Sequence, residues 1–425
     1  MNRITLAIFS PSGQSGFRVL VLVVMLGISL VYGFPHLLWL NDIDWDYKNA
    51  IFITSFKAWD ANHYIAQIKE IYEGNYLLSN TYIAECKNVG KSSWPLFPYY
   101  LSAFVGKLFH LEVQYLVVLM DFTLPPLIFL LAYLFLYTLS NRRTTSIFGA
   151  FILILTPHIA RLDILSLIGF HVMKYGFTPP ILADAHCYYC FSRTINPQLT
   201  YTFLLASLLF FSKGTTTLKN KYFIISSLFG ILTSYSYVFF SSYLYVFWSV
   251  SAISFFMLNE KALFQKSLVV LSSTLVFASP FWYSVFSRSD EDLEQMTGPF
   301  RSHSPITYSG FMGGYLKYQL LLTLVVCLLI VSCLLKGYGN RLTDVVSLSL
   351  LLSGVICLEQ HVITGIAVQA WHYEIFVLPQ STILVGTLLV TDFMRHLNLQ
   401  RRSVISLILY GGIGLASISA LLSPS

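Results

Sequence analysis

Four carboxylates follow the first apolar run of the chain and are well suited to acid–base chemistry. Asp42, Asp44 and Asp46 lie just beyond this run, and Asp60 opens a segment with helical periodicity. At a membrane surface, a carboxylate can take a proton from a hydroxyl group or hold a divalent cation beside a lipid phosphate. A carboxylate at a helix N-terminus can equally be a cap that accepts backbone N–H groups. Local sequence leaves both interpretations of Asp60 open.

An arginine in a later polar segment has a suitable position for binding phosphate. Arg193 stands shortly before the apolar run that begins at Gln198. A guanidinium group pairs with two phosphate oxygens at once, so arginine suits a phosphate leaving group. The alternative is that Arg193 only extends from the bilayer to the interface, as arginines near span ends do. Arg161 and Lys174 are rival cations.

A short polar segment near the C-terminus gathers several hydrogen-bonding side chains. It contains Gln360, His361, Gln369, Trp371 and His372. Such groups suit hydrogen bonds to sugar or phosphate, and a histidine can carry charge near neutral pH. The alternative is a polar loop whose side chains bond their own backbone. We single out His361, Gln369 and His372 as candidate substrate-binding residues.

The amino-acid composition indicates the kind of protein to which these residues belong. Of 425 residues, 56% are hydrophobic and 11% are charged, with a mean hydropathy of +0.67. Soluble domains carry about a quarter charged residues. A polytopic, all-α integral membrane protein is therefore expected, as a single domain over residues 1–425, in contact with lipid and not with nucleic acid.

The apolar windows predict about eleven transmembrane helices, because a spanning helix needs about 20 apolar residues. Two of them are short and should extend into their flanking loops. The expected spans are Arg18–Leu40, Gln114–Leu139, Thr145–Pro157, Gln198–Phe211, Tyr222–Val238, Ser241–Leu258, Ser267–Phe286, Tyr318–Leu335, Val345–Leu358, Tyr373–Val390 and Val404–Leu421.

The distribution of Lys and Arg predicts the orientation. Alternate loops hold 14 Lys and Arg against 3 Asp and Glu. Because basic loops stay in the cytoplasm, the N-terminus is expected there and the C-terminus outside. The first apolar run is expected to be an uncleaved signal anchor. A bacterial plasma membrane is expected, since the chain ends without a eukaryotic retention signal.

The long loops all fall on the expected outer side, at residues 41–113, 159–197 and 288–317. Long ordered loops are commonly functional, so the active face is expected to be extracytoplasmic. Residues 62–76 of the first loop have the periodicity of an amphipathic helix that ends at Gly74 and Asn75. We expect its apolar face in the lipid headgroup zone. A second juxtamembrane helix is expected over residues 96–109.

Three motifs on the outer loops resemble the GT-C superfamily of membrane glycosyltransferases. Residues 59–64, WDANHY, resemble its D-E-x-x-Y signature. Residues 94–101, WPLFPYYL, are similar to its K-P-P-L-x-Y-W-L stretch, and the pair His372-Tyr373 before Leu378-Pro379 resembles its R-Y-x-x-x-x-P motif. The matched segments cover under a third of the chain. The resemblance implies a divergent GT-C-like fold and the use of a polyprenyl-phosphate-linked sugar donor.

The resemblance also implies residue roles. Asp60 matches the catalytic position and would be the general base on an acceptor hydroxyl in an inverting transfer, with Asp46 as the alternative. Tyr64 matches the signature tyrosine and joins the substrate-binding candidates. Ala61 replaces the usual second acidic residue, and no spacing matches a closed metal site. The metal is therefore left unassigned and a divalent cation is left open.

Two other classes of function remain open. A polysaccharide polymerase, or a flippase or transporter of lipid-linked glycans, would also have many spans and polar outer loops. A transporter should place ionisable groups at mid-membrane, and this chain has few, since Asp121 lies near the outer end of a span. The third class is a non-enzymatic membrane subunit, whose complex would keep its activity when the outer carboxylates are lost.

Overall fold

The protein is described from a computed structural model that defines residues 15–42, 59–76, 95–155, 191, 194–286, 327–328, 330–331, 340–364 and 371–396. Every regular element in these ranges is a helix. Asp46, Arg193 and Gln369 lie outside the described residues. The same holds for the expected span Val404–Leu421 and for most of Tyr318–Leu335.

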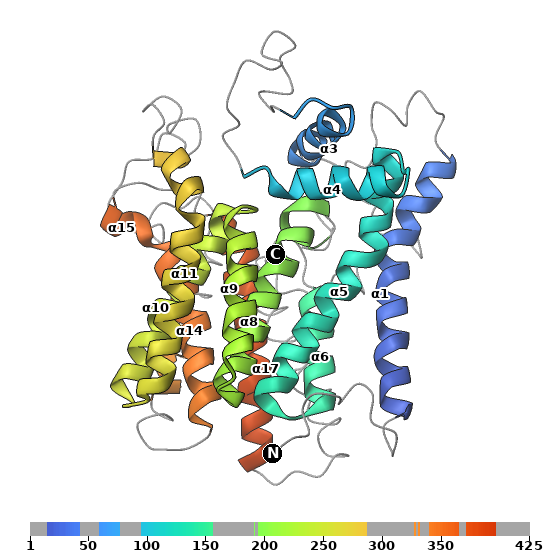
Figure 1. The fold of residues 1–425 in the computed structure, drawn as a ribbon. Coiled ribbons are helices and arrows are strands. Elements are labelled where there is room, and N and C mark those ends of the chain that lie inside the picture. Colours follow the sequence, from blue (N-terminus) through green and yellow to red (C-terminus); the bar gives the residue numbers. More distant parts are fainter. Residues whose placement is uncertain are drawn as a thin grey trace, which may run out of the picture.

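The long helices stand side by side as a bundle, and two shorter helices lie across one end of it (Figure 1). The crossing pair is α3 (Trp59–Tyr72) and α4 (Phe97–Leu108). The bundle consists of α1 (Ser15–Asp42), α5 (Val113–Ser140), α6 (Arg143–Ile154), α8 (Thr200–Thr217), α9 (Asn220–Ser234), α10 (Val238–Met257), α11 (Lys261–Phe286), α14 (Arg341–Leu358) and α17 (Leu378–His396). Three short elements connect to it: η3 (Thr194–Leu199), α15 (Gln360–Thr364) and α16 (Trp371–Phe376).

Five of the described helices are long and apolar enough to cross a membrane. The expected total of about eleven spans is therefore not confirmed, although the all-helical class is. Helices such as α6, with 12 residues, are too short to span about 30 Å of hydrocarbon by themselves. The candidate spans are Gly16–Phe34, Val113–Ser140, Val238–Met257, Lys261–Ser284 and Arg341–Leu358.

One expected span is two helices. The run Tyr373–Val390 is divided at Val377 between α16 and α17. Pro379 is the second residue of α17, where its missing N–H costs nothing, whereas the same proline inside a continuous helix would remove a hydrogen bond. Proline in this run therefore starts a new helix, which the apolar pattern alone did not reveal.

Side chains on the outside of the bundle are apolar, as contact with lipid requires. Leu22 and Leu26 of α1 are exposed, and so are Val276 and Phe277 of α11. An apolar surface of this extent is unusual on a protein surrounded by water. Inside, Trp248 and other aromatic side chains form the core. The helices of this bundle thus present a surface suited to a bilayer.

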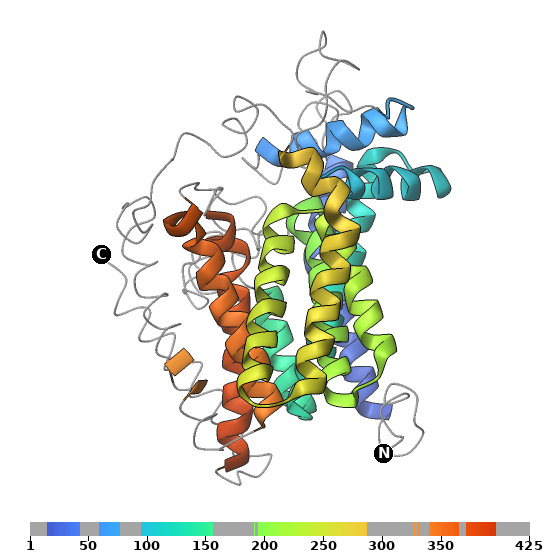
Figure 2. The same ribbon diagram turned by 60° about the vertical axis from the view of Figure 1, so that its left-hand side comes forward.

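The described basic loops share one end of the bundle, which we call the basic end. The turns between α5 and α6, between α8 and α9 and between α10 and α11 lie there, opposite α3 and α4 (Figures 1 and 2). These turns carry Arg142, Lys219 and Lys261. We call the opposite end the α3 end. The alternation of basic loops along the sequence thus has a counterpart in space, and the side that faces the cytoplasm stays a prediction.

Candidate functional site

Helix α3 forms because its apolar residues recur every three or four positions. Ile68 and Ile71 are buried in one cluster with Tyr99 of α4 and Ile195 of η3. The helix stops at Gly74, whose φ of +100° suits glycine, and the N–H of Asn75 donates to the carbonyl of Glu70 at 2.8 Å. The predicted amphipathic helix and its C-terminal signal are confirmed.

The apolar face of α3 packs against protein, which corrects its expected place in the headgroup zone. It lies on α4, α5 and η3. The helix that presents apolar side chains outward is α4, where Phe104, Leu108 and Phe109 are exposed. The sequence predicted two amphipathic helices, and in the structure these two helices, α3 and α4, pack against each other.

Asp60 is the second residue of α3, and its side chain lies outside the described residues. Helical register puts residue 60 on the same side as His63 and Gln67, three and seven positions later. Nε2 of Gln67 lies 2.7 Å from Nε2 of His63, and Gln67 is buried. Tyr64 is half-buried, with its ring centroid 5.8 Å from that of Tyr99. Tyr64 therefore has a packing role in the contact between α3 and α4.

A buried polar pair joins α5 to η3. Nε2 of Gln198 donates to Oδ1 of Asp121 and to the carbonyl of Phe191, each at 2.5 Å. Asp121 and Gln198 are both fully buried. Asp121 stood out as an acid within an apolar run. Its partnership with Gln198, 77 residues later, had no signal in the sequence.

His372 of α16 sits among aromatic side chains. Its ring stacks on Phe239 with centroids 4.1 Å apart and planes 4° from parallel. Its Nδ1 forms a hydrogen bond with the hydroxyl of Tyr237, and the imidazole is buried. On the next residue, the hydroxyl of Tyr373 lies 2.7 Å from Oγ of Ser242. His372 is thus held rigidly at the N-terminal end of α10.

His361 occupies α15, the other short element beside the end of α14. Its ring is buried, with Nε2 4.0 Å from a carboxylate oxygen of Glu359. Both α15 and α16 contact α14. The two predicted histidines therefore lie near the same helix end. Gln369, the third residue predicted in this segment, lies outside the described residues.

An aromatic row connects the η3 region to His372. Ring centroids are 4.9 Å apart for Phe191 and Tyr201, 5.5 Å for Tyr201 and Phe240, and 4.8 Å for Phe240 and Tyr237. Tyr237 then contacts His372. The row is joined to η3, on which α3 packs, through Gln198, whose side-chain nitrogen donates to the carbonyl of Phe191. This row was not predicted, because four of its members read as ordinary aromatic residues in apolar segments.

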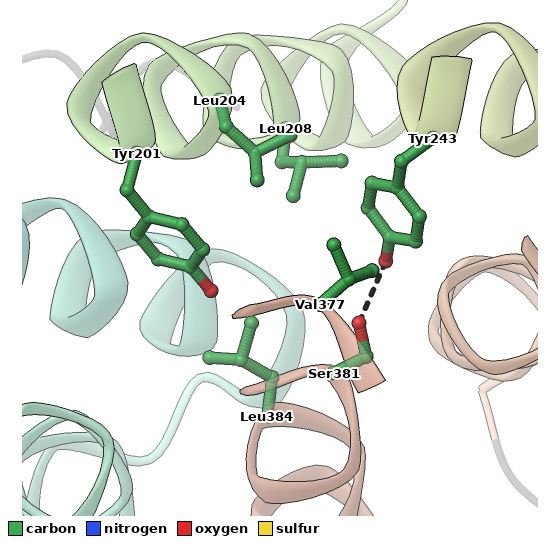
Figure 3. A pocket seen from close by; sticks show the side chains of 7 residues that line it. All are labelled: Tyr201, Leu204, Leu208, Tyr243, Val377, Ser381 and Leu384. Atoms are coloured by element: carbon green, nitrogen blue, oxygen red, sulfur yellow. Dashed lines mark hydrogen bonds between the residues drawn. The ribbon is translucent and has the colours of Figure 1, made fainter. Parts of the chain in front are cut away.

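Below the row, a small gap lies between α8, α10 and α17 (Figure 3). The hydroxyl of Tyr243 bonds Oγ of Ser381 at 2.8 Å on one side, and Tyr201 forms the opposite wall. Its lining is otherwise aliphatic. Among the described residues, no three His, Cys, Asp or Glu side chains are grouped as a metal ion would require.

No family model matches the sequence, and the search of curated proteins finds no significant similarity. The function of the protein is therefore inferred from its residues and their arrangement.

Proposed function

We propose that the protein is a membrane glycosyltransferase that moves a sugar from a polyprenyl-phosphate-linked donor to a hydroxyl acceptor at its α3 end. The observation that carries the proposal is the position of α3. This helix begins at the signature residues Trp59 and Asp60, lies across the end of the bundle and contacts η3. Arg193 directly precedes η3 in the sequence. The candidate base thus belongs to α3, and the candidate phosphate-binding cation adjoins, in the sequence, the element that α3 contacts.

The proposed reaction needs one proton transfer and one displacement. The carboxylate of Asp60 takes the proton of the acceptor hydroxyl while that oxygen bonds to the anomeric carbon. The bond between the anomeric carbon and the phosphate oxygen breaks, and its electron pair leaves with the lipid phosphate. Arg193 pairs with the phosphate as its charge grows. Inversion at the anomeric carbon follows from a single displacement.

His372 would bind substrate within this scheme. Its hydrogen bond to Tyr237 and its stacking on Phe239 fix the orientation of the imidazole. A fixed imidazole donates or accepts a hydrogen bond without first losing rotational freedom. His361, Gln369 and Tyr64 are the further residues proposed for this binding region.

The proposal assigns the α3 end to the extracytoplasmic side of a bacterial plasma membrane and the basic end to the cytoplasm. The support is the positive-inside tendency together with the collection of basic turns at one end of the bundle. Lipid-linked donors made in the cytoplasm would then be used after crossing the bilayer.

The test is the Asp60→Asn substitution in the purified full chain, held in nanodiscs with membrane lipid extract as the acceptor source. The measured quantity is release of undecaprenyl phosphate from undecaprenyl-phosphate glucose, mannose and galactose. We expect wild type to act on at least one donor and Asp60→Asn to lower that rate about 100-fold or more, because general bases contribute roughly 10²–10⁴-fold.

The matched control is Glu73→Gln, which removes a carboxylate just after the end of the same helix. Glu73 is half exposed and pairs with Lys69 at 3.9 Å, so its loss should leave the rate unchanged. A wild-type rate in Asp60→Asn would defeat the catalytic role of Asp60 and move the test to Asp46→Asn.

A transporter of lipid-linked glycans is the second candidate, and Asp121 is the observation that favours it. A fully buried carboxylate inside a candidate span is costly and commonly functional. If flipping of a fluorescent lipid-linked sugar were lost in Asp121→Asn and kept in Asp60→Asn, the transporter would be the better account.

A further inference from the structure

Two side chains of η3 bury amide oxygens that accept no hydrogen bond from the residues that the structure describes. Oδ1 of Asn196 and Oε1 of Gln198 are both inaccessible to solvent and have no partner among the described residues. Asn196 is 5% exposed and Gln198 is 0% exposed. Leaving a buried acceptor unpaired is unfavourable, so two such oxygens in one short element require an explanation.

The orientation of the Gln198 amide follows from its contacts. Its nitrogen faces a carboxylate oxygen of Asp121 and the carbonyl of Phe191, and both are acceptors. The nitrogen must therefore be the bound atom, and the oxygen must be the unpaired one. If the amide nitrogen and oxygen of Gln198 were exchanged, the oxygen would face the carboxylate of Asp121 and the carbonyl of Phe191, and all three oxygens are acceptors. A group that binds to Oε1 of Gln198 must therefore be a hydrogen-bond donor.

The backbone of η3 differs from a regular helix at this point. Asn196 has φ −117° and ψ 112°, which is extended geometry, and Pro197 follows it. A residue before proline favours this region, so the sequence itself imposes the break. The break carries Asn196 and Gln198 on a short irregular segment between Arg193 and α8.

A third amide oxygen lies on α3, the helix that packs against η3. Oε1 of Gln67 is buried and has no hydrogen-bond partner in the described part of the chain, and the side chain is 2% exposed. Gln67 shares a helix side with residue 60, as described above. Unpaired acceptors therefore occur on both of the contacting elements, α3 and η3.

We propose that Asn196 and Gln198, together with Gln67, form a subsite that accepts hydrogen bonds from the hydroxyl groups of the transferred sugar. A phosphate dianion offers only acceptors, so it is unsuited to these oxygens, whereas sugar hydroxyls donate. This inference rests on the proposed function and assigns the recognition of the sugar, as distinct from the lipid phosphate, to η3 and α3.

The test compares the affinity of the full chain, in nanodiscs, for undecaprenyl phosphate and for its glucose, mannose and galactose derivatives, measured by native mass spectrometry. We expect at least one glycosylated lipid to bind about tenfold more tightly than undecaprenyl phosphate, as one or two net hydrogen bonds would give. Asn196→Leu should reduce this preference to about twofold or less and leave the affinity for undecaprenyl phosphate unchanged.

Thermal unfolding separates this role from a structural one. Leucine fits the extended backbone of residue 196 and removes an unpaired buried acceptor, so Asn196→Leu should keep or raise the unfolding temperature. Ser251→Ala is the control, because the buried hydroxyl of Ser251 in α10 also has no partner within the described ranges. It should keep or raise stability in the same way and retain the sugar preference. Gln67→Met provides a second test variant on α3.

The outcomes are distinguishable. If wild type shows no preference for any of the three sugars, or if Asn196→Leu and Gln67→Met both retain it, the subsite is wrong. If the chain binds neither undecaprenyl phosphate nor its glycosylated forms, the proposed function itself fails.

Discussion

At the scale of single residues, the His372 environment gives a prediction that separates function from stability. Tyr237→Phe removes the hydrogen bond to Nδ1 of His372 and retains the aromatic contacts with Phe239 and Phe240. The loss of one buried hydrogen bond should lower the free energy of unfolding by about 1 kcal/mol. If His372 binds substrate, transfer should fall about tenfold or more, because the imidazole loses its fixed orientation.

Tyr373→Phe is the matched control for this experiment. It removes a buried hydroxyl bonded to Ser242, one residue away from His372. Its free energy of unfolding should fall by a similar amount, about 1 kcal/mol. The rate of donor consumption should stay within about twofold of wild type. Equal losses of transfer in the two variants would show that Tyr237 acts only through stability.

Residue types in the candidate site could be selected from sequence, and their partners could not. Asp60 and His372 stand in recognisable motifs, and Asp121 interrupts an apolar run. The bond between Asp121 and Gln198 depends on where α5 and η3 meet in space. The unpaired oxygens of Asn196 and Gln198 depend on the same packing, so sequence could not reveal them.

At the scale of helices, two glycines give predictions of opposite sign. A Cβ on Gly149 of α6 would lie 2.3 Å from Oγ1 and 2.8 Å from Cβ of Thr387 on α17. Gly149→Ala should therefore separate α6 from α17 and destabilise the bundle by about 1–3 kcal/mol. The measurement is the unfolding temperature of the detergent-solubilised protein.

Gly386, one residue before Thr387, is the control. A Cβ there meets nothing within 4 Å, and alanine suits a helix better than glycine by about 0.5–1 kcal/mol. Gly386→Ala should therefore leave stability unchanged or raise it. A destabilised Gly386→Ala beside a neutral Gly149→Ala would refute the described contact between α6 and α17.

Helix positions could be predicted from sequence more reliably than helix roles. Helices α3 and α4 lie where they were expected, over residues 62–76 and 96–109, and the expected Gly74 follows the end of α3. Apolar runs located most bundle helices, but a run of apolar residues does not say whether a helix faces lipid or protein. That difference arises in the folded bundle, which is why the apolar side of α3 was expected in the headgroup zone.

At the scale of the whole molecule, the separation of the basic end from the α3 end predicts sidedness. After replacement of the native cysteines, Tyr76→Cys at the α3 end should react with a membrane-impermeant maleimide in intact cells. Lys219→Cys at the basic end should react only after permeabilisation. Both positions are exposed, so the bilayer alone should decide the difference. The reverse pattern would put α3 in the cytoplasm.

Composition was sufficient to predict a helical membrane protein, and it was insufficient to count the spans. Hydropathy measures apolar length, whereas short helices such as α6 and polar-containing helices such as α8 join the bundle by packing on their neighbours. The number of crossings therefore depends on contacts between helices as well as on apolar length.

Cryo-electron microscopy of the full chain with bound undecaprenyl phosphate would locate the lipid phosphate relative to the proposed base. If the two meet at the α3 end, the phosphate will lie beside Arg193, with the attached sugar of a donor analogue within about 3–6 Å of the Asp60 carboxylate, a direct hydrogen bond or one bridging water. A phosphate bound at the basic end, or one remote from both Asp60 and Asp46, would show that they do not meet there.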